Sequence, residues 1–379
     1  MKKNSNKIVA IFSAYIPPHL GGIERYVDNL VREFNKLGYK IIMVTSNYNN
    51  SDDIEINNDN LIIRLPVYNS FKNRYPIIKH NKKTKYLMDK LNSYSISFII
   101  VNTRFHLTSH VGVKYGNKHN IPVYLIEHGS NYVTLDNKFI DFFANRYEDF
   151  LTWKIKKKVS GFYGVSKACG NWLKKININM DGVWYNSIDT NQKLPKKEKH
   201  RTINFLYAGR LIKQKGVDNI LIAFSKLSID YKNLKLYIAG DGPEFDNYKV
   251  KYKDANIIFL GKLDYKNLLK YYAKTDVFLY PPLWPEGLPT SILEAGLMKC
   301  TVIGTNQGGI VEIIENEKNG IIVDNDWNSL YLAMKRLISE KKLLNKYSTE
   351  IYNTVQVKFS WEKNAKKILG DIDEKQKNR

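Results

Sequence analysis

The chain has 379 residues, enough for two ordinary domains of roughly 150 to 200 residues each, and its hydrophobic content of 43% with 13% aromatics excludes wholesale disorder. Its formal charge of +22 fits three kinds of anionic partner: nucleic acid, an anionic membrane surface or a phosphorylated substrate. An abundance of Asn, Ile, Lys and Tyr throughout the chain accounts for part of this charge. The two cysteines, Cys169 and Cys300, lack paired metal-ligand spacing and offer no disulfide framework, which favours a reducing compartment.

Residues 7–14 (KIVAIFSA) are predicted to form a first buried strand. Lysines before an apolar run imitate a signal peptide, but this run is short, contains Ser13 and ends in Pro17 and Pro18 without a small-residue cleavage site. No apolar stretch of the sequence approaches the length needed to cross a bilayer.

A Gly-rich turn and a helix follow. Apolar residues recur at three- and four-residue steps from Ile23 to Leu37, Gly38 ends the helix, and residues 39–45 form the next strand. This order predicts a βαβ unit. Gly21 and Gly22 in the turn would let the backbone approach a ligand closely, although ordinary turn glycines would have the same pattern.

Residues 71–91 mix basic and apolar side chains. The basic ones are Lys72, Arg74, Lys79, Lys82, Lys83 and Lys85, and the apolar ones are Phe71, Tyr75, Ile77, Ile78, Tyr86 and Leu87. The mixture suits a surface that rests on anionic lipid headgroups, and it equally suits a solvated helix whose apolar side faces the core.

Polar residues follow two further predicted strands. Strand 96–101 is followed by Asn102, Thr103, Arg104 and His106, and strand 121–126 by residues 127–130 (EHGS). The carboxyl ends of parallel strands form the ligand-facing edge of an open α/β sheet, so His128 is a candidate catalytic residue, with a purely structural histidine as the alternative. Residues 137–158 are predicted to be helical, and residues 161–173 (GFYGVSKACGNWL) to form strand, turn and helix with Ser166 as N-cap.

In the second half, strand 203–208 leads into GRLIKQKG. The planar guanidinium of Arg210 and the ammonium of Lys215 could bind a diphosphate between them. The alternative is that both are unrelated surface charges. Strand 234–239 ends in the turn GDGP at residues 240–243, and strand 256–260 follows.

The most informative stretch is residues 280–310. Strand 276–280 is followed by Pro281, Pro282, Pro285 and Gly287, which enforce a loop, and Pro289 marks the start of a helix. A helix start at the carboxyl end of a parallel strand attracts phosphate.

Two carboxylates with seven residues between them, Glu286 and Glu294, flank this helix start. Carboxylates do not bind phosphate, but they accept hydrogen bonds from hydroxyls. Phosphate on the helix end together with hydroxyls on the carboxylates describes a nucleotide-sugar.

The element PEGLPTSILEAG resembles the donor-binding E-x7-E signature of retaining GT-B glycosyltransferases, in particular the family 4 group. The loop GGIERY, the motif EHG, the stretch GRLIKQKG and the turn GDGP extend the resemblance along nearly the whole chain. Ser187, Lys299 and Thr301 depart from it, since the family has Gly, Gly and Pro there.

The resemblance implies an α/β GT-B fold with two Rossmann-like domains whose parallel sheets face a central cleft. The expected limits are residues 1–188 for the acceptor-side domain, 189–201 for a linker, 202–358 for the nucleotide-sugar domain, and 359–379 for a helix that crosses back to the first domain.

The resemblance also implies roles for single residues. His128 lies beside the donor sugar and Glu286 faces its hydroxyls as the catalytic pair, Glu294 accepts from the ribose, and the base lies against the backbone of residues 261–263. The full donor-binding set implied is Gly21, Gly22, Arg210, Lys215, Gly242, Gly261, Lys262, Leu263, Gly287, Leu288, Pro289, Thr290 and Glu294.

The implied activity is retaining, metal-independent transfer of a sugar from a UDP- or GDP-sugar to a glycan or lipid-linked acceptor in cell-surface polysaccharide synthesis, such as lipopolysaccharide or capsule, with no cofactor. The basic and aromatic segment 71–91 motivates the further hypothesis that the acceptor is lipid-linked and that the protein is cytoplasmic and peripheral, on the inner face of the cytoplasmic membrane. Two alternatives stay open: a sugar-nucleotide epimerase of the same architecture, and a basic nucleic-acid-binding protein.

Overall fold

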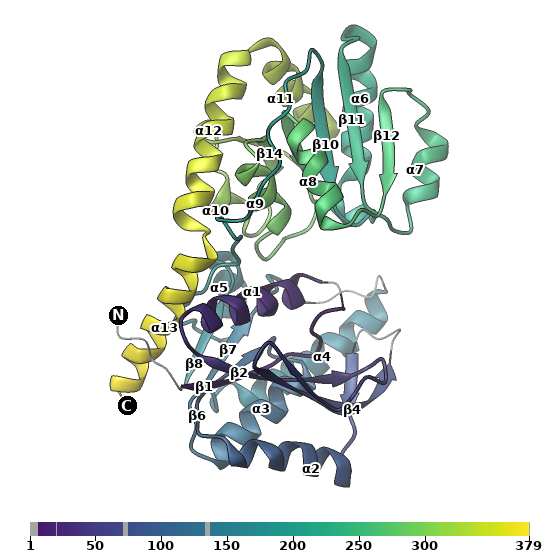
Figure 1. Ribbon diagram of the computed structural model, residues 1–379. Coiled ribbons are helices and arrows are strands. Elements are labelled where there is room, and N and C mark those ends of the chain that lie inside the picture. The colour runs from purple at the N-terminus through teal and green to yellow at the C-terminus, as the bar shows by residue number, and fades with distance from the viewer. Residues whose placement is uncertain (1–6, 20, 71–74, 133–136, 379) are drawn as a thin grey trace. The chain divides into compact units, whose positions relative to one another are not determined.

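The structure is a computed structural model that describes residues 7–19, 21–70, 75–132 and 137–378. The chain divides into two compact units (Figure 1). The first unit comprises Met1–Tyr185 together with Trp361–Arg379, and the second comprises Asn186–Ser360.

The first unit is built on one mostly parallel sheet. Its described strands are β1 (Ile8–Phe12), β2 (Lys40–Asn47), β3 (Ile54–Asn57), β4 (Asn60–Ser70), β5 (Tyr75–Ile78), β6 (Ile96–Asn102), β7 (Val123–Glu127), β8 (Gly161–Gly164) and β9 (Gly182–Val183). The order is β3-β4-β2-β1-β6-β7-β8-β9, with β5 paired to β4. Strands β3 and β5 run antiparallel to β4, and the other pairs are parallel. Central strands such as β1 read as continuous apolar runs because helices cover both faces of a parallel sheet.

The helices of the first unit are α1 (Gly22–Lys36), α2 (Lys82–Asp89) with a following 3-10 turn (Lys90–Ser93), α3 (Leu107–Lys118), α4 (Lys138–Ile155), α5 (Lys167–Lys175) and α13 (Trp361–Lys377). Helices α1 and α3 lie on opposite sides of the sheet (Figure 1). Helix α5 is N-capped by Ser166, whose hydroxyl accepts from the Cys169 N–H at 3.1 Å, as predicted.

Helix α13 comes from the far end of the chain but packs within the first unit. The ring of its first residue, Trp361, packs edge to face against the Tyr26 ring of α1, with 4.8 Å between the ring centroids. The Trp184 indole N–H donates to Asp371 of the same helix at 2.9 Å, and Asn364 donates to the Tyr185 carbonyl. The last helix therefore completes the core of the first unit.

The second unit has a wholly parallel sheet in the order β12-β11-β10-β13-β14-β15. The strands are β10 (Ile203–Ala208), β11 (Leu234–Ala239), β12 (Ile257–Gly261), β13 (Val277–Tyr280), β14 (Thr301–Thr305) and β15 (Ile321–Val323). The helices are α6 (Val217–Asp230), α7 (Phe245–Lys251), α8 (Tyr265–Lys274), α9 (Thr290–Leu297), α10 (Ile310–Ile313), α11 (Trp327–Ser339) and α12 (Lys341–Lys358), with a 3-10 turn at Lys213–Lys215.

The segment 189–201, expected as a linker, lies along the second unit. The Lys197 amine donates to the carbonyls of Tyr272, Thr275 and Met298, which end helices α8 and α9. A cation at these helix ends interacts favourably with carbonyls at the negative end of each helix dipole. The predicted linker is therefore tied to the second unit through the Lys197 side chain.

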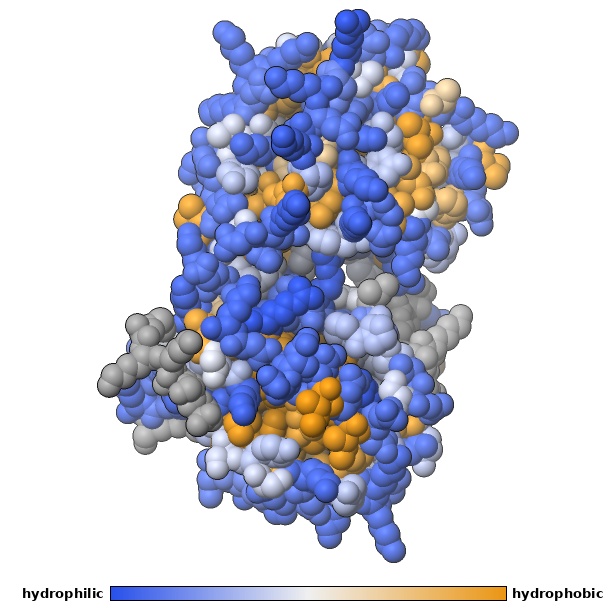
Figure 2. Space-filling view, in the orientation of Figure 1, coloured by the Kyte–Doolittle hydropathy of each residue, from blue (hydrophilic) through white to orange (hydrophobic). Residues whose placement is uncertain are grey.

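The described part of the basic and apolar segment 71–91 forms strand β5 and helix α2, while residues 71–74 lie outside the described residues. Helix α2 buries Thr84 and Leu87, and Tyr86 is 57% exposed. Figure 2 shows a mostly hydrophilic surface with an apolar patch over β2 and β4 of the first unit, and Ile54 and Ile56 of the neighbouring β3 are exposed. Among the described residues, no helix has both the length and the apolarity that crossing a membrane requires.

Candidate active site

The loops that carry the predicted donor site meet at one edge of the second unit's sheet. All strands of this sheet are parallel, so the loops after β10, β11, β12 and β13 leave from the same edge. Backbone hydrogen bonds tie them together: the Gly240 N–H donates to the Gly261 carbonyl at 2.8 Å and the Leu211 N–H to the Asp241 carbonyl at 2.9 Å. The four predicted segments thus form one continuous rim.

Two glycines allow these loops to approach at backbone distance. Gly216 has φ +69°, and a Cβ there would lie 2.0 Å from the Pro281 carbonyl oxygen. Gly308 has φ +58°, and its Cβ would lie 2.0 Å from the Glu286 carbonyl oxygen. Any side chain would combine a strained backbone with a collision, so glycine at both positions fixes the loop that carries Glu286.

Lys215 and Glu286 are paired with each other on this rim. The Lys215 Nζ lies 2.5 Å from Glu286 Oε1 and 3.2 Å from the Tyr280 hydroxyl. Burial alone lowers the pKa of Lys215, but Tyr280 and the Glu286 carboxylate together outweigh it and hold the pKa above its ordinary value. Lys215 is therefore cationic at neutral pH, and its partner carboxylate is oriented by it.

Arg210 lies on the loop that follows β10, with an exposed side chain. Its carbonyl accepts from the Tyr207 hydroxyl at 3.0 Å, which anchors the backbone and leaves the guanidinium in solvent. A fixed backbone with a guanidinium exposed to solvent is suited to binding an anionic ligand.

Glu294 lies on the second turn of α9 and is buried, with 2% of its surface exposed. The Tyr272 hydroxyl lies 3.1 Å from Glu294 Oε2 and 3.2 Å from the Ser291 carbonyl. A buried carboxylate needs donors, and Tyr272 of α8 supplies one.

The remaining predicted donor residues flank these side chains. Pro289 is the N-cap of α9 and Thr290 its first residue, one position later than a proline in the first helical turn would give. The Leu288 carbonyl accepts from the Asn186 amide at 3.2 Å. The others on the rim are Gly242, Gly261, Lys262, Leu263 and Gly287, of which Lys262 is exposed.

The other three candidates lie in the first unit. Gly21 is the N-cap of α1 and Gly22 its first residue. Beside them, His19 Nδ1 lies 2.9 Å from Glu24 Oε1, and a Cβ on Gly21 would meet the Glu24 carboxylate at 2.2 Å. The turn therefore presents a histidine–carboxylate pair at the start of α1.

His128 directly follows β7, and its ring is fixed from two sides. The Tyr26 ring of α1 packs edge-on against it at 4.9 Å. Asn102 donates through its amide nitrogen to the Phe12 carbonyl at 3.1 Å, so its oxygen faces His128 Nε2 at 3.0 Å. Burial lowers the pKa of His128 to about 3, so the ring is neutral at pH 7, with the proton on Nε2 and with Nδ1 as the acceptor.

A buried ionic triad supports the histidine loop. Glu127 Oε1 accepts from the N–H groups of His128 and Gly129 at 3.0 and 3.1 Å. Its other oxygen lies 3.1 Å from Arg104 Nη1, and Arg104 Nη2 lies 2.7 Å from Glu148 Oε2 of α4. Arg104 is fully buried, and its removal would leave the two buried carboxylates of Glu127 and Glu148 without their cation.

The predicted site residues fall into two groups. His128, Gly21 and Gly22 belong to the first unit, and the predicted donor residues from Arg210 to Glu294 belong to the second. Sequence reasoning missed the partners of these residues: Tyr272, Tyr280, Asn102 and Glu24. The first three are distant in sequence from the residues they hold, whereas Glu24 lies inside the GGIERY turn and was visible there.

Two family models match consecutive parts of the chain. The one described as Glycosyltransferase Family 4 matches residues 20–192, and the one described as Glycosyl transferases group 1 matches residues 188–354. The chain belongs to the group 1, family 4 glycosyltransferases.

This glycosyltransferase is similar along its length to known proteins. The uncharacterized glycosyltransferase MJ1069 of Methanocaldococcus jannaschii is 27% identical over 380 residues, which span 94% of this chain and 95% of that protein. The phosphatidylinositol N-acetylglucosaminyltransferase GPI3 subunit of Saccharomyces cerevisiae is 19% identical over 95% of this chain and 81% of that protein. The crystal structure of Anabaena Alr3699/HepE in complex with UDP-glucose matches with a TM-score of 0.72 at 15% identity, over 97% of this chain and 99% of that one. The fold of the glycosyltransferase is GT-B, as the sequence predicted.

Proposed function

We propose that this glycosyltransferase moves a sugar from a nucleoside diphosphate sugar to a glycan or lipid-linked acceptor, with retention at the anomeric carbon, in the synthesis of a cell-surface polysaccharide. The observation that carries the donor assignment is the rim of the second unit, where Arg210, the Lys215–Glu286 pair and the start of α9 gather on loops joined through their backbones. The complex of the similar HepE structure with UDP-glucose supports a nucleotide-sugar donor.

In this proposal the donor diphosphate binds Arg210, Lys215 and the N-terminus of α9. These positive groups stabilise the negative charge that develops on the leaving nucleoside diphosphate, and they supply that charge without a metal ion. Glu294 accepts from the ribose hydroxyls. Glu286, oriented by Lys215, accepts from hydroxyls of the transferred sugar.

The chemical step proposed is front-face attack through an oxocarbenium-like state. The bond from the anomeric carbon to the phosphate oxygen breaks, the acceptor oxygen bonds to the same face, and the departing phosphate oxygen takes the acceptor's proton. His128 contributes a neutral ring whose Nδ1 can accept from a sugar hydroxyl without competing for that proton. Exclusion of water protects the donor from hydrolysis.

The acceptor side of the proposal has support from one relative. The similar GPI3 subunit is, by its name, a transferase that acts on phosphatidylinositol, which is a lipid. A lipid-linked acceptor at the inner face of the cytoplasmic membrane fits the charge of +22 and the basic segments of the first unit.

The test is donor turnover across a panel of UDP- and GDP-sugars, with anomeric configuration read by NMR. Arg210→Ala should lower kcat/KM by roughly 10²–10³-fold because it removes one charge from the leaving group. Lys213→Ala, an exposed lysine three residues along the same loop, is the matched control and should retain activity. Full activity of Arg210→Ala would refute the placement of the diphosphate, and product formed without acceptor would favour an epimerase.

A further inference from the structure

The outward face of helix α4 is aromatic. Side chains at three- and four-residue steps along this helix are exposed, with Phe139 at 72% and Trp153 at 66%. The exposed apolar and aromatic set is Phe139, Ile140, Phe142, Phe143, Tyr147, Phe150 and Trp153. A helix on a soluble domain ordinarily turns its polar face outward, so a contiguous face of this kind indicates a binding surface.

Cations lie among these rings. Lys154 Nζ lies 5.1 Å from the Phe150 ring centroid, and the Arg146 guanidinium lies 5.9 Å from that of Phe142. Lys157 and Lys158 follow the helix and are exposed. Aromatic rings that alternate with Lys and Arg on one helix face match the chemistry of the interface between anionic headgroups and acyl chains.

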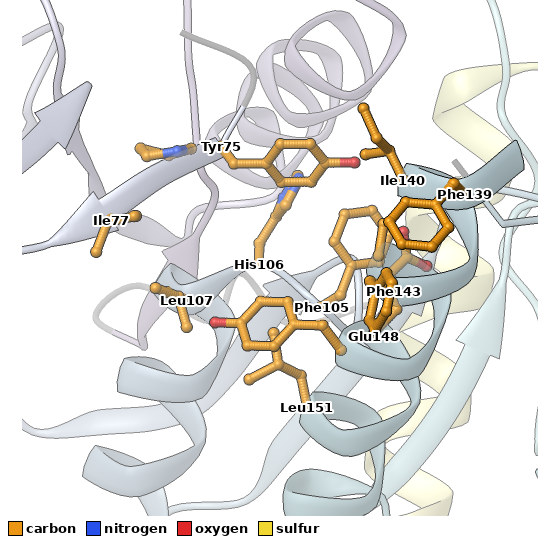
Figure 3. Close-up of a pocket in the computed structure, with 13 residues that line it drawn as sticks. Tyr75, Ile77, Phe105, His106, Leu107, Phe139, Ile140, Phe143, Glu148 and Leu151 are labelled. Atoms are coloured by element: carbon orange, nitrogen blue, oxygen red, sulfur yellow. The ribbon is translucent and has the colours of Figure 1, made fainter. Parts of the chain in front are cut away.

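An apolar pocket opens beside the same helix (Figure 3). Its volume is about 470 Å³, within the range of small-ligand sites. Its walls come from β5, from the segment after β6 and from α4. The lining side chains are Tyr75, Pro76, Ile77, Phe105, His106, Leu107, Phe139, Ile140, Phe143, Ala144, Tyr147, Glu148 and Leu151.

The polar groups of the pocket do not favour binding of a charged ligand. Burial lowers the pKa of His106 to about 4, so its ring is neutral at pH 7. The Glu148 carboxylate is paired with Arg104. The remaining wall is apolar or aromatic, and such a wall selects an apolar ligand through the hydrophobic effect.

We propose that the outward face of α4 rests on an anionic bilayer, and that the pocket beside it binds the apolar chain of a membrane-borne acceptor. This inference rests on the proposed function, and it names the acceptor as a lipid with an extended hydrocarbon chain. The aromatic side chains enter the interface, Arg146, Lys154, Lys157 and Lys158 meet the headgroups, and the chain passes from the bilayer into the pocket.

The pocket is joined to the candidate catalytic histidine. Glu148 lines the pocket, Arg104 pairs Glu148 with Glu127, and Glu127 holds the His128 N–H. A lipid chain in the pocket therefore lies in the same unit as His128 and against the network that positions it. This connection favours an acceptor over a lipid unrelated to the reaction.

The surface is tested by cosedimentation of the full chain with vesicles of phosphatidylglycerol and phosphatidylcholine, 1:1, against phosphatidylcholine alone. The double variant Phe150→Ser, Trp153→Ser should lower the partition coefficient on anionic vesicles by about tenfold, since two aromatic anchors leave the interface. Ile229→Ser on α6, a side chain 69% exposed in the second unit, is the matched control and should bind as wild type. Equal binding of the double variant would overturn the proposal, as would a dimer in light scattering that this variant converts to monomer.

The pocket is tested by calorimetric titration with dodecyl phosphate below its micelle concentration, against butyl phosphate. Dodecyl phosphate has eight more methylenes to bury than butyl phosphate, so it should bind at least about tenfold more tightly. Ala144→Phe fills the pocket and should abolish the difference between the two chains. Where that variant lowers the melting temperature, Ile77→Asp at the exposed edge of the pocket replaces it. Equal affinity for both chains in the wild type would overturn the pocket assignment.

Stabilisation by UDP or GDP, measured on the same samples, separates this inference from the function on which it rests. Failure of the lipid measurements with binding of either nucleotide intact would refute the acceptor site alone. Lipid binding without any response to UDP or GDP would instead refute the donor assignment.

Discussion

At the scale of single residues, the predicted donor residues and His128 are held in place by partners that lie far away in sequence. The pair Lys215 and Glu286 was predicted as two separate ligand contacts, yet a 2.5 Å ion pair joins them. The sequence could predict that these residues follow strands and glycines at one edge of a parallel sheet, and their contact with a ligand stays a prediction. It could not predict their mutual contacts, because these depend on how the loops after β10 and β13 fold against each other.

A substitution of Glu294 should weaken donor binding while the protein stays folded. Glu294→Gln keeps an oxygen that can accept from Tyr272 but removes the charge, so the KM for the donor should rise by roughly 10- to 100-fold if one charge-assisted hydrogen bond to the ribose is lost. Steady-state kinetics with varied donor measure this. Tyr272→Phe is the control, since it should lower the free energy of unfolding by ~1–3 kcal/mol by leaving a buried carboxylate with fewer donors. An unchanged KM in Glu294→Gln would make Glu294 structural only.

The buried histidines predict how stability depends on pH. Burial lowers the pKa of His106 and His110 to about 4 and that of His128 to about 3. As the pH falls through about 6.5, these histidines become protonated in the unfolded chain but stay neutral in the folded one. The free energy of unfolding is therefore unaffected by them above pH 6.5 and decreases as the pH falls toward 4. The slope is up to ~1.4 kcal/mol per pH unit for each histidine. Urea unfolding at pH 7.5, 6 and 5 should show it, with a shallower slope for His110→Gln; identical slopes would contradict the assignment.

At the scale of elements, most strands and helices were predictable from apolar runs and turn residues. Strands β1, β10, β11 and β13, the N-cap Ser166 and the loop with a following helix after β13 lie where the sequence predicted them. Helix α4 was predicted as a helix, but its outward aromatic face was not, because periodicity does not tell which face a helix buries. In segment 189–201, composition did not predict one contact: the Lys197 ammonium binds carbonyls at two helix ends.

The close contact between two rim loops gives a prediction at this scale. Gly308→Ala should destabilise the chain by ~1–3 kcal/mol and impair donor binding, because φ is +58° and the new Cβ would meet the Glu286 carbonyl. Gly370→Ala on α13 is the matched control: no atom lies within 4 Å of its Cβ, and the helix should gain ~0.5–1 kcal/mol. Thermal unfolding with and without UDP measures both effects. Wild-type stability of Gly308→Ala would show that the rim loops can separate.

At the scale of the whole molecule, the GT-B fold was predictable because its motifs recur at fixed places along both halves of the chain. The charge of +22 allowed nucleic acid as a partner as well as a nucleotide-sugar. UDP or GDP at 100 times its Kd should stabilise the protein by about 2.7 kcal/mol, which raises the melting temperature by roughly 5–10 °C. Duplex DNA at 0.15 M salt should give no comparable rise. A shift with DNA and none with either nucleotide would favour the nucleic-acid alternative.

The return of helix α13 has a consequence for synthesis on the ribosome. Trp361 covers Tyr26, and Tyr26 packs on His128, so the half of the protein that is translated first lacks a piece of its core until the final residues emerge. Residues 186–360 can meanwhile complete a folded domain of their own. A premature stop codon after Ser360 should therefore leave the domain of residues 186–360 able to fold and destabilise the domain of residues 1–185.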